Sequence, residues 1–169
     1  MQSSSAAVLP APEPVAPTAA APPVPLVLFS LADRAFALPA GSVVQIAPAE
    51  SLQEAVAGPA WRRGTVRQNG QEVEVLDLRV FLRMRATQTS ADRHLITVRL
   101  GQGDRRCGLL AQRVWRVQAL PLVPLVVPAS WRNGPGSTFL RGVLAYEGRP
   151  LFLLDIDRLL TGPELAGEP

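Results

Sequence analysis

A repeat within the chain constrains its fold more than any other feature of the sequence. Residues 63–82 align with residues 141–160 without a gap, at a constant offset of 78, and six of the twenty pairs are identical. Residues 34–46 align in the same order with residues 105–117. The alternative is chance similarity between strand-rich segments. The period is too long for a solenoid and two copies are too few, so the repeat predicts a duplicated small domain.

The pattern within each copy is typical of β-strands. Short apolar segments at 26–31, 36–38 and 43–46 precede two polar–apolar segments that flank Asn69-Gly70, the dipeptide best suited to a type I′ hairpin turn. Asp77 then precedes a short helix predicted over residues 78–84, where its carboxylate is a natural N-cap. A copy of about 60 residues is marginal by itself, so we expect the copies to pack side by side with a groove between them.

The ends of the chain differ from its centre. Residues 1–25 contain seven alanines, seven prolines and a single charge, Glu13, which predicts an extended tether. Residues 163–169 form a short tail. The apolar runs are well short of the ~20 residues that a membrane span needs, and the N-terminus lacks the features of a signal peptide. The sequence therefore predicts a cytoplasmic protein.

The residue inventory excludes most catalytic chemistry. The chain has one cysteine, Cys107, one histidine, His94, and no lysine, since all 17 basic residues are arginines. A Cys/His zinc site and Schiff-base chemistry therefore lack their residues. Asp77 and Asp155, at equivalent helix starts, and Asp157 are expected to cap rather than catalyse. No catalytic residue, cofactor or metal is predicted. Cys107 is predicted to be a small buried hydrophobic residue.

The motifs follow an order that resembles a known family. They are F-x-L and F-A-L-P near residues 29–39, V-x-x-I at 43–46, R-G…N-G…V-L-D-L at 63–78, G-L-L at 108–110, and L-R-G…G-R-P…L-L-D-I-D-R-L-L at 140–160. This order is similar to the CheW-like domain of CheW adaptors and CheA kinases, over residues 26–162. The resemblance implies a mainly β fold of two tandem SH3-like five-stranded barrels packed side by side, at about 26–84 and 93–160, each followed by a short helix.

The same resemblance implies a non-enzymatic adaptor in chemotaxis and two-component signal transduction. Such a scaffold binds the regulatory domain of a CheA-type histidine kinase through one surface. Through another it binds the cytoplasmic tip of a chemoreceptor, so that the protein is cytoplasmic and located at membrane-associated receptor arrays. Neither nucleic acid nor direct insertion into the membrane is implied.

The family's interaction positions can be carried over residue by residue. Val43 and Gly64 match positions at the receptor-facing surface, and Asn69-Gly70 takes the place of the R-G in the family's N-L-R-G turn, with Arg67 at its asparagine. Gln45 stands where an acidic residue is frequent, and Glu74 replaces a proline. Since arginine is enriched at interfaces, we also expect Arg63 there. The changed positions indicate a divergent adaptor, and the predicted protein-binding set is Val43, Gln45, Arg63, Gly64, Arg67, Asn69 and Gly70.

A β-barrel nucleic-acid-binding protein is the alternative. It is favoured by the arginine clusters at positions 62, 63 and 67 and at 79, 83 and 85, although 14 acidic residues are spread among the arginines and the formal net charge is only +3. We expect the second cluster to be a solvated helix face. Of the tryptophans, Trp115 is expected in the core, with Trp61 and Trp131 partly exposed.

Overall fold

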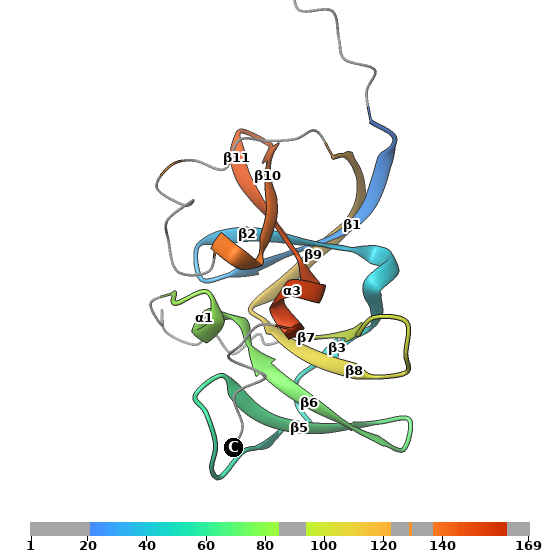
Figure 1. Ribbon diagram of the computed structural model, residues 1–169, viewed down its shortest axis with the longest axis vertical. Helices are drawn as coiled ribbons and strands as arrows, with labels where there is room; N and C mark the ends of the chain where they lie inside the picture. The colour runs from blue at the N-terminus through green and yellow to red at the C-terminus, as the bar shows by residue number, and fades with distance from the viewer. Residues whose placement is uncertain (1–20, 85–93, 123–128, 130–136, 162–169) are drawn as a thin grey trace, which may run out of the picture.

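Two β-sheets, one above the other, form the protein (Figure 1). The computed structural model describes residues 21–84, 94–122, 129 and 137–161. The five strands of the upper sheet, sheet A, are in spatial order β10 (Leu140–Tyr146), β11 (Arg149–Leu154), β2 (Arg34–Pro39), β1 (Pro23–Leu31) and β9 (Arg113–Pro121). The six strands of the lower sheet, sheet B, are β3 (Val43–Pro48), β7 (His94–Arg99), β8 (Arg106–Ala111), β6 (Gln71–Asp77), β5 (Arg62–Gln68) and β4 (Gln53–Glu54).

The repeat in the sequence is also a repeat of backbone conformation. β5, β6 and helix α1 (Leu78–Phe81) recur 78 residues later as β10, β11 and helix α3 (Ile156–Thr161). The turn residues Asn69 and Gly70 have φ of 50° and 78°, and Glu147 and Gly148 have φ of 48° and 74°. Positive φ at both central residues confirms the predicted primed hairpin turn. A register shift before Gly64 likewise recurs before Gly142.

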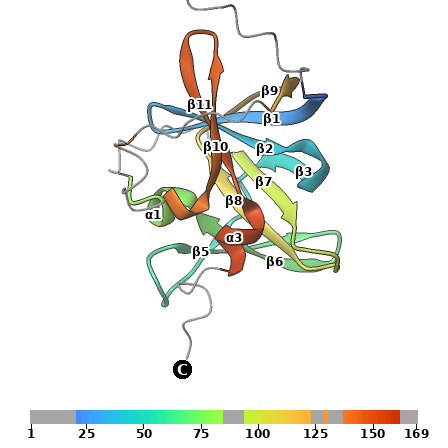
Figure 2. The same cartoon turned by 45° about the horizontal axis from the view of Figure 1, so that its top comes forward.

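The two units are not consecutive along the chain. The mainly β fold with two SH3-like units and short helices is confirmed, but β1 and β2 join β9–β11 in sheet A, while β3–β8 form sheet B. The division into barrels at 26–84 and 93–160 is therefore wrong. Its physical cause is two parallel pairings, β11 with β2 and β6 with β8, which join each half's hairpin to a strand of the other half. Figure 2 shows the resulting interleaving of the early and late strands.

The predicted boundaries at the chain ends change only slightly. β1 begins at Pro23, inside the segment expected to be a tether, because its first residues pair with the end of β9. The rest of the predicted tether, the connection at residues 85–93, Arg85, Trp131 and the tail at 163–169 lie outside the described residues. Among the helices that the structure describes, none is long and apolar enough to span a bilayer.

The buried apolar residues form three clusters, one within each sheet and one shared by both sheets. One fills the inside of sheet A around Leu26, Leu144 and Leu151, and its equivalent fills sheet B around Leu95, Val66 and Val73. The largest cluster is shared by both sheets, and in it the rings of Phe29, Phe36 and Phe152 pack 5.5 to 6.0 Å apart between centroids. Since a fully buried large apolar side chain contributes about 1.5–3 kcal/mol, the shared cluster makes each sheet depend on the other.

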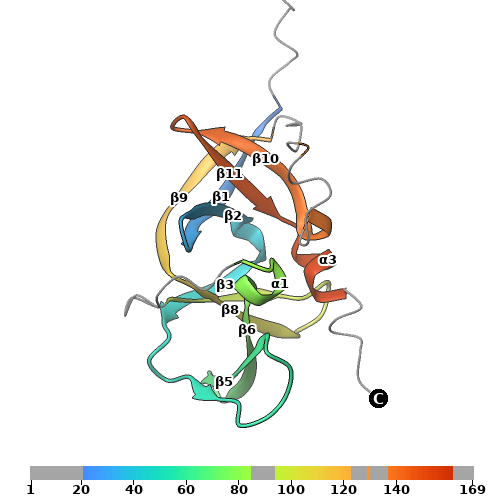
Figure 3. The ribbon, with the colours of Figure 1, turned by 90° about the vertical axis from the view of Figure 1, so that its left-hand side faces the viewer.

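The helices lie beside this shared cluster (Figure 3). Asp77 caps α1 as predicted, accepting a hydrogen bond of 3.0 Å from the backbone N–H of Arg79. The helix ends at Phe81, earlier than predicted, and Arg83 has a left-handed φ of 47°. The Arg79 guanidinium also donates to the Asp77 carboxylate at 2.9 and 2.7 Å. The expectation that Arg79 lies on a solvated helix face is therefore wrong. The nearly buried carboxylate needs this partner, and the bond raises the pKa of Arg79.

Separating the halves tests the interleaved topology. We expect fragments 21–84 and 94–161, each kept monomeric by low concentration, to show no cooperative thermal unfolding by circular dichroism, because each lacks strands of both barrels. Mixing them should restore a cooperative transition. A monomeric fragment that unfolds cooperatively by itself would contradict the strand order.

The thiol of Cys107 provides a second test of the core. Burial raises the pKa of Cys107 to about 12, with a smaller contribution from the charge of Glu74. We therefore expect an aromatic disulfide reagent to leave the folded chain unmodified at pH 8 and to label it promptly in guanidinium, where the pKa returns to about 8.5. Since the folded state favours the thiol, this contribution to stability declines as pH rises from about 8.5 towards 12. Rapid stoichiometric labelling of the folded chain would refute the burial.

Candidate functional site

The predicted protein-binding residues fall into two groups on sheet B. Val43 and Gln45 lie on the edge strand β3, where Val43 is half-buried against the shared core and Gln45 is exposed. The other five residues lie on β5 and in its hairpin turn, and β7, β8 and β6 separate them from β3 within the sheet: Arg63, Gly64, Arg67, Asn69 and Gly70. The structure therefore does not bring the predicted set together in one patch along the sheet.

A buried hydrogen bond connects the two groups. Thr97 on β7 donates from its hydroxyl to Oε1 of Gln68 on β5 at 2.9 Å, and both side chains are buried. Thr97 also lies opposite Gln45 in the antiparallel pairing of β3 and β7. Gln68 directly precedes Asn69. Because a buried polar group is costly without a partner, this bond fixes the position of the hairpin relative to β3.

Carboxylates accompany the arginines of the hairpin. Arg62 forms an ion pair of 2.7 Å with Glu74, and Arg63 one of 3.5 Å with Glu54. Arg67 lies opposite Glu72 in the strand pairing. These exposed pairs add little stability, but they reduce the local excess of positive charge. The cluster that favoured nucleic-acid binding is therefore largely balanced.

Asn69 suits the conformation of the hairpin turn. Its φ of 50° lies in the left-handed region, which asparagine adopts more readily than longer side chains. The following Gly70 has φ of 78° and open space around it. The asparagine thus suits the turn conformation and places a short, uncharged side chain at the hairpin tip.

Gly64 holds the short strand β4 close to β5. Its φ is +145°, and a Cβ atom there would overlap the backbone carbonyl oxygen of Gln53. β4 pairs with β5 through Gln53 and Glu54, so the glycine also keeps Glu54 within reach of Arg63. Among the residues that the structure describes, no atom lies near the same position at its repeat counterpart Gly142. Within these residues, the close approach occurs in the first copy.

Sequence reasoning missed the exposed apolar residues of the two edge strands. Val44 and Ile46 on β3 are 36% and 38% exposed, and Trp115 and Val117 on β9 are 42% and 59% exposed. The signal was present, because residues 43–46 and 114–117 are aligned in the repeat. Both strands also have a register shift at the aligned position, which passes over Val44 and Trp115.

Trp115 and Trp61 differ in their exposure and in their packing. Trp115 is exposed rather than in the core, because the β-bulge in β9 turns its side chain away from the alternating inward positions. Trp61 is partly exposed, as expected, and packs on Phe81 with a centroid distance of 5.5 Å. Its repeat equivalent Phe139 packs on the same ring at 6.0 Å.

Asp155, Asp157 and Cys107 have structural roles. Asp155 accepts a hydrogen bond of 3.1 Å from the backbone N–H of Arg158, and Asp157 lies in the first turn of α3, as predicted for capping. Cys107 is buried, as predicted. In the described ranges, no three His, Cys, Asp or Glu side chains are grouped closely enough to hold a metal ion.

The two repeat glycines form a matched pair for mutation. Gly64→Ala is expected to destabilise the protein by about 1–3 kcal/mol, because it forces a side chain into a disfavoured φ and against β4. Gly142→Ala should change the free energy of unfolding by less than about 1 kcal/mol. Denaturant unfolding of both variants measures the difference. Equal effects would show that β4 does not approach β5 as described.

Comparisons with known proteins agree with this architecture. The family model described as CheW-like domain matches residues 25–164. The chain is 25% identical over 142 residues to the chemotaxis protein CheW of Treponema pallidum (strain Nichols), covering 83% of this chain and 84% of that protein. The crystal structure of the scaffolding protein TtCheW from Thermoanaerobacter tengcongensis has the same fold, with a TM-score of 0.71 and 19% identity over 82% of this chain and 93% of that one. The chain belongs to the CheW-like domain family.

Proposed function

We propose that this protein is a non-enzymatic adaptor that couples chemoreceptors to a CheA-type histidine kinase. The observation that carries the proposal is the family match over nearly the whole folded chain, residues 25–164. A chemotaxis protein and a scaffolding protein are among its relatives by sequence and by structure. The adaptor works in the cytoplasm, at membrane-associated receptor arrays, by holding kinase and receptor in a fixed geometry.

The edge strands β3 and β9 are suited to docking the regulatory domain of the kinase. Each lies at the end of its sheet, so that one side of its backbone has no partner among the strands that the structure describes. Each also presents two exposed apolar side chains, Val44 with Ile46 and Trp115 with Val117. Unpaired edges and apolar side chains together favour contacts with another β domain.

The receptor contact is proposed for the region of Val43, Gln45 and the β5–β6 hairpin. Val43 is half-buried between the sheets, and the hairpin position is fixed by the Thr97–Gln68 hydrogen bond. The differences from the family at Gln45, Arg67, Asn69 and Glu74 make this contact divergent.

Edge-strand substitutions test the kinase contact. Ile46→Asp and Val117→Asp are expected to weaken binding of a cognate kinase regulatory domain by tenfold or more, because each places a charge in an apolar contact. Val56→Asp is the matched control, since Val56 is fully exposed in a loop. Isothermal titration of each variant, after its thermal unfolding has been checked, measures the effect. If neither the kinase domain nor a receptor hairpin binds the natural chain, the adaptor function is wrong, and salt-sensitive binding to DNA would favour the nucleic-acid alternative.

Asn69→Arg tests whether the hairpin tip tunes the interaction. Restoring the family's arginine should strengthen capture of the chain by receptor and kinase, while costing a few tenths of a kcal/mol or more through the left-handed turn. Pull-down of the receptor and the kinase encoded in the same genome, with the natural chain and with Asn69→Arg, measures the difference in capture. Unchanged capture would remove Asn69 from the interaction surface.

A further inference from the structure

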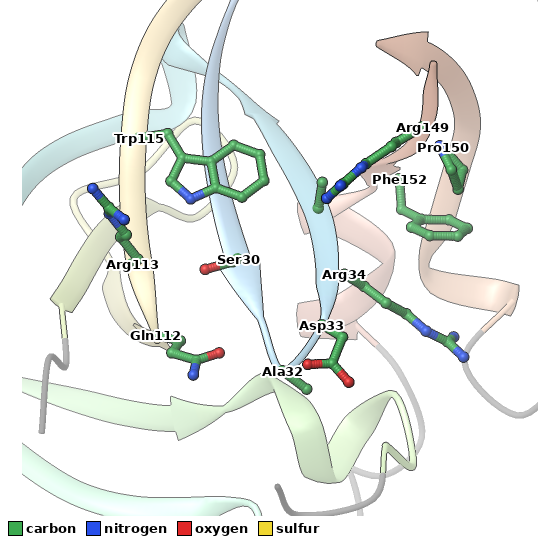
Figure 4. A pocket seen from close by; sticks show the side chains of 11 residues that line it. Ser30, Ala32, Asp33, Arg34, Gln112, Arg113, Trp115, Arg149, Pro150 and Phe152 are labelled. Carbon is green, nitrogen blue, oxygen red and sulfur yellow. The ribbon is translucent and has the colours of Figure 1, made fainter. Parts of the chain in front are cut away.

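A cavity of about 400 Å³ opens on sheet A, at the crossing from β8 to β9. Figure 4 shows Trp115 of β9 on one side and Arg149 of β11 on the other, with Ser30 between them. Asp33 and Gln112 lie at its lower end in the same view. Cavities that bind small molecules span about 300–1,000 Å³, so this one is large enough for a ligand.

Trp115 provides an aromatic platform in the cavity wall. The bulge between β1 and β9 places it outside the regular alternation of the strand, with 42% of its surface exposed. An exposed indole stacks well on flat aromatic rings. The platform favours a ligand with a planar ring.

Three arginines, Arg34, Arg113 and Arg149, line the cavity together with Asp33 and Gln112. Arg149 forms no ion pair or hydrogen bond with any residue that the structure describes, so its guanidinium is available to an anion. At the other end, the side-chain Oε1 of Gln112 is buried and has no hydrogen-bond partner within the described ranges. The Asp33 carboxylate adds acceptors there. A fitting ligand carries a negative charge for Arg149 and N–H donors for the acceptors of Gln112 and Asp33.

The repeat supplies an internal comparison. A second hollow lies at the equivalent place on sheet B, lined by residues that include Gln71, Glu74, Arg105 and Arg106. Gln71 is the repeat counterpart of Arg149, and Val44, the counterpart of Trp115, does not line this hollow. The fold therefore produces a hollow at this place twice, and of the two the one on sheet A is lined by an indole.

We propose that the cavity on sheet A binds a purine nucleotide. The base stacks on the Trp115 indole, its N–H donors face Gln112 and Asp33, and the phosphate is bound by Arg149, which can hold it through two hydrogen bonds. A planar aromatic acid without N–H donors would leave the Gln112 oxygen unsatisfied. This inference does not depend on the adaptor function.

Fluorescence titration of the full chain with GMP tests the proposal. Stacking should quench the emission of Trp115 in a saturable way, with AMP, guanosine and inorganic phosphate as comparison probes. Since a stacked base contributes about 1–3 kcal/mol, Trp115→Ala should weaken binding about tenfold, measured by calorimetry. Arg149→Ala should weaken GMP but not guanosine, and Trp115→Phe should retain most of the affinity. Val44→Ala and Gln71→Ala, at the equivalent positions on sheet B, are the controls and should bind as the natural chain does.

Several results would overturn the proposal. No saturable binding of either nucleotide up to millimolar concentration is one. Phosphate binding as tightly as GMP is another, since it would leave only a general anion site. If the natural chain binds no nucleotide, and Trp115→Ala and Arg149→Ala no longer bind the kinase domain, the cavity belongs to a protein interface instead.

Discussion

The exchange of strands between the two halves of the chain is the constraint on which the rest of the structure depends. β2 pairs in parallel with β11, and β6 in parallel with β8, so neither half completes a sheet by itself. The chain therefore crosses between the sheets twice, after β2 and after β8. The largest apolar cluster includes residues of both sheets. Because two strands that pair in parallel need a long connection between them, this arrangement requires a repeat long enough to provide that connection.

The crossings also determine where the exposed surfaces lie. Each crossing leads directly into an edge strand, β3 or β9, whose bulge exposes an apolar side chain. Around these strands the two copies have diverged. The copy that contains β3 has balanced charges on its hairpin and a glycine that admits β4. The copy that contains β9 has an indole and an arginine around a cavity. A repeated fold thus offers similar positions with different chemistry.

Much of the local structure could be predicted from particular residues. Asn69-Gly70 predicted the hairpin, since positive φ at two successive positions suits these residues. Asp77 predicted the helix start, and the offset of 78 predicted the second copy. The wrong expectations have one physical cause. Trp115 is exposed because of a bulge and the barrel division fails because of parallel pairings, and a strand pattern specifies neither the neighbouring strand nor an irregularity in its register.

The sequence by itself determined the elements, their order and their duplication, because turns, caps and apolar alternation act over a few residues. Only the tertiary structure decided which strands pair, because parallel pairings join segments about 30 to more than 100 residues apart and leave no local signal. It also decided the difference between Gly64 and Gly142. Both follow an arginine in the same motif, yet within the described residues only Gly64 closely approaches another backbone segment, that of β4.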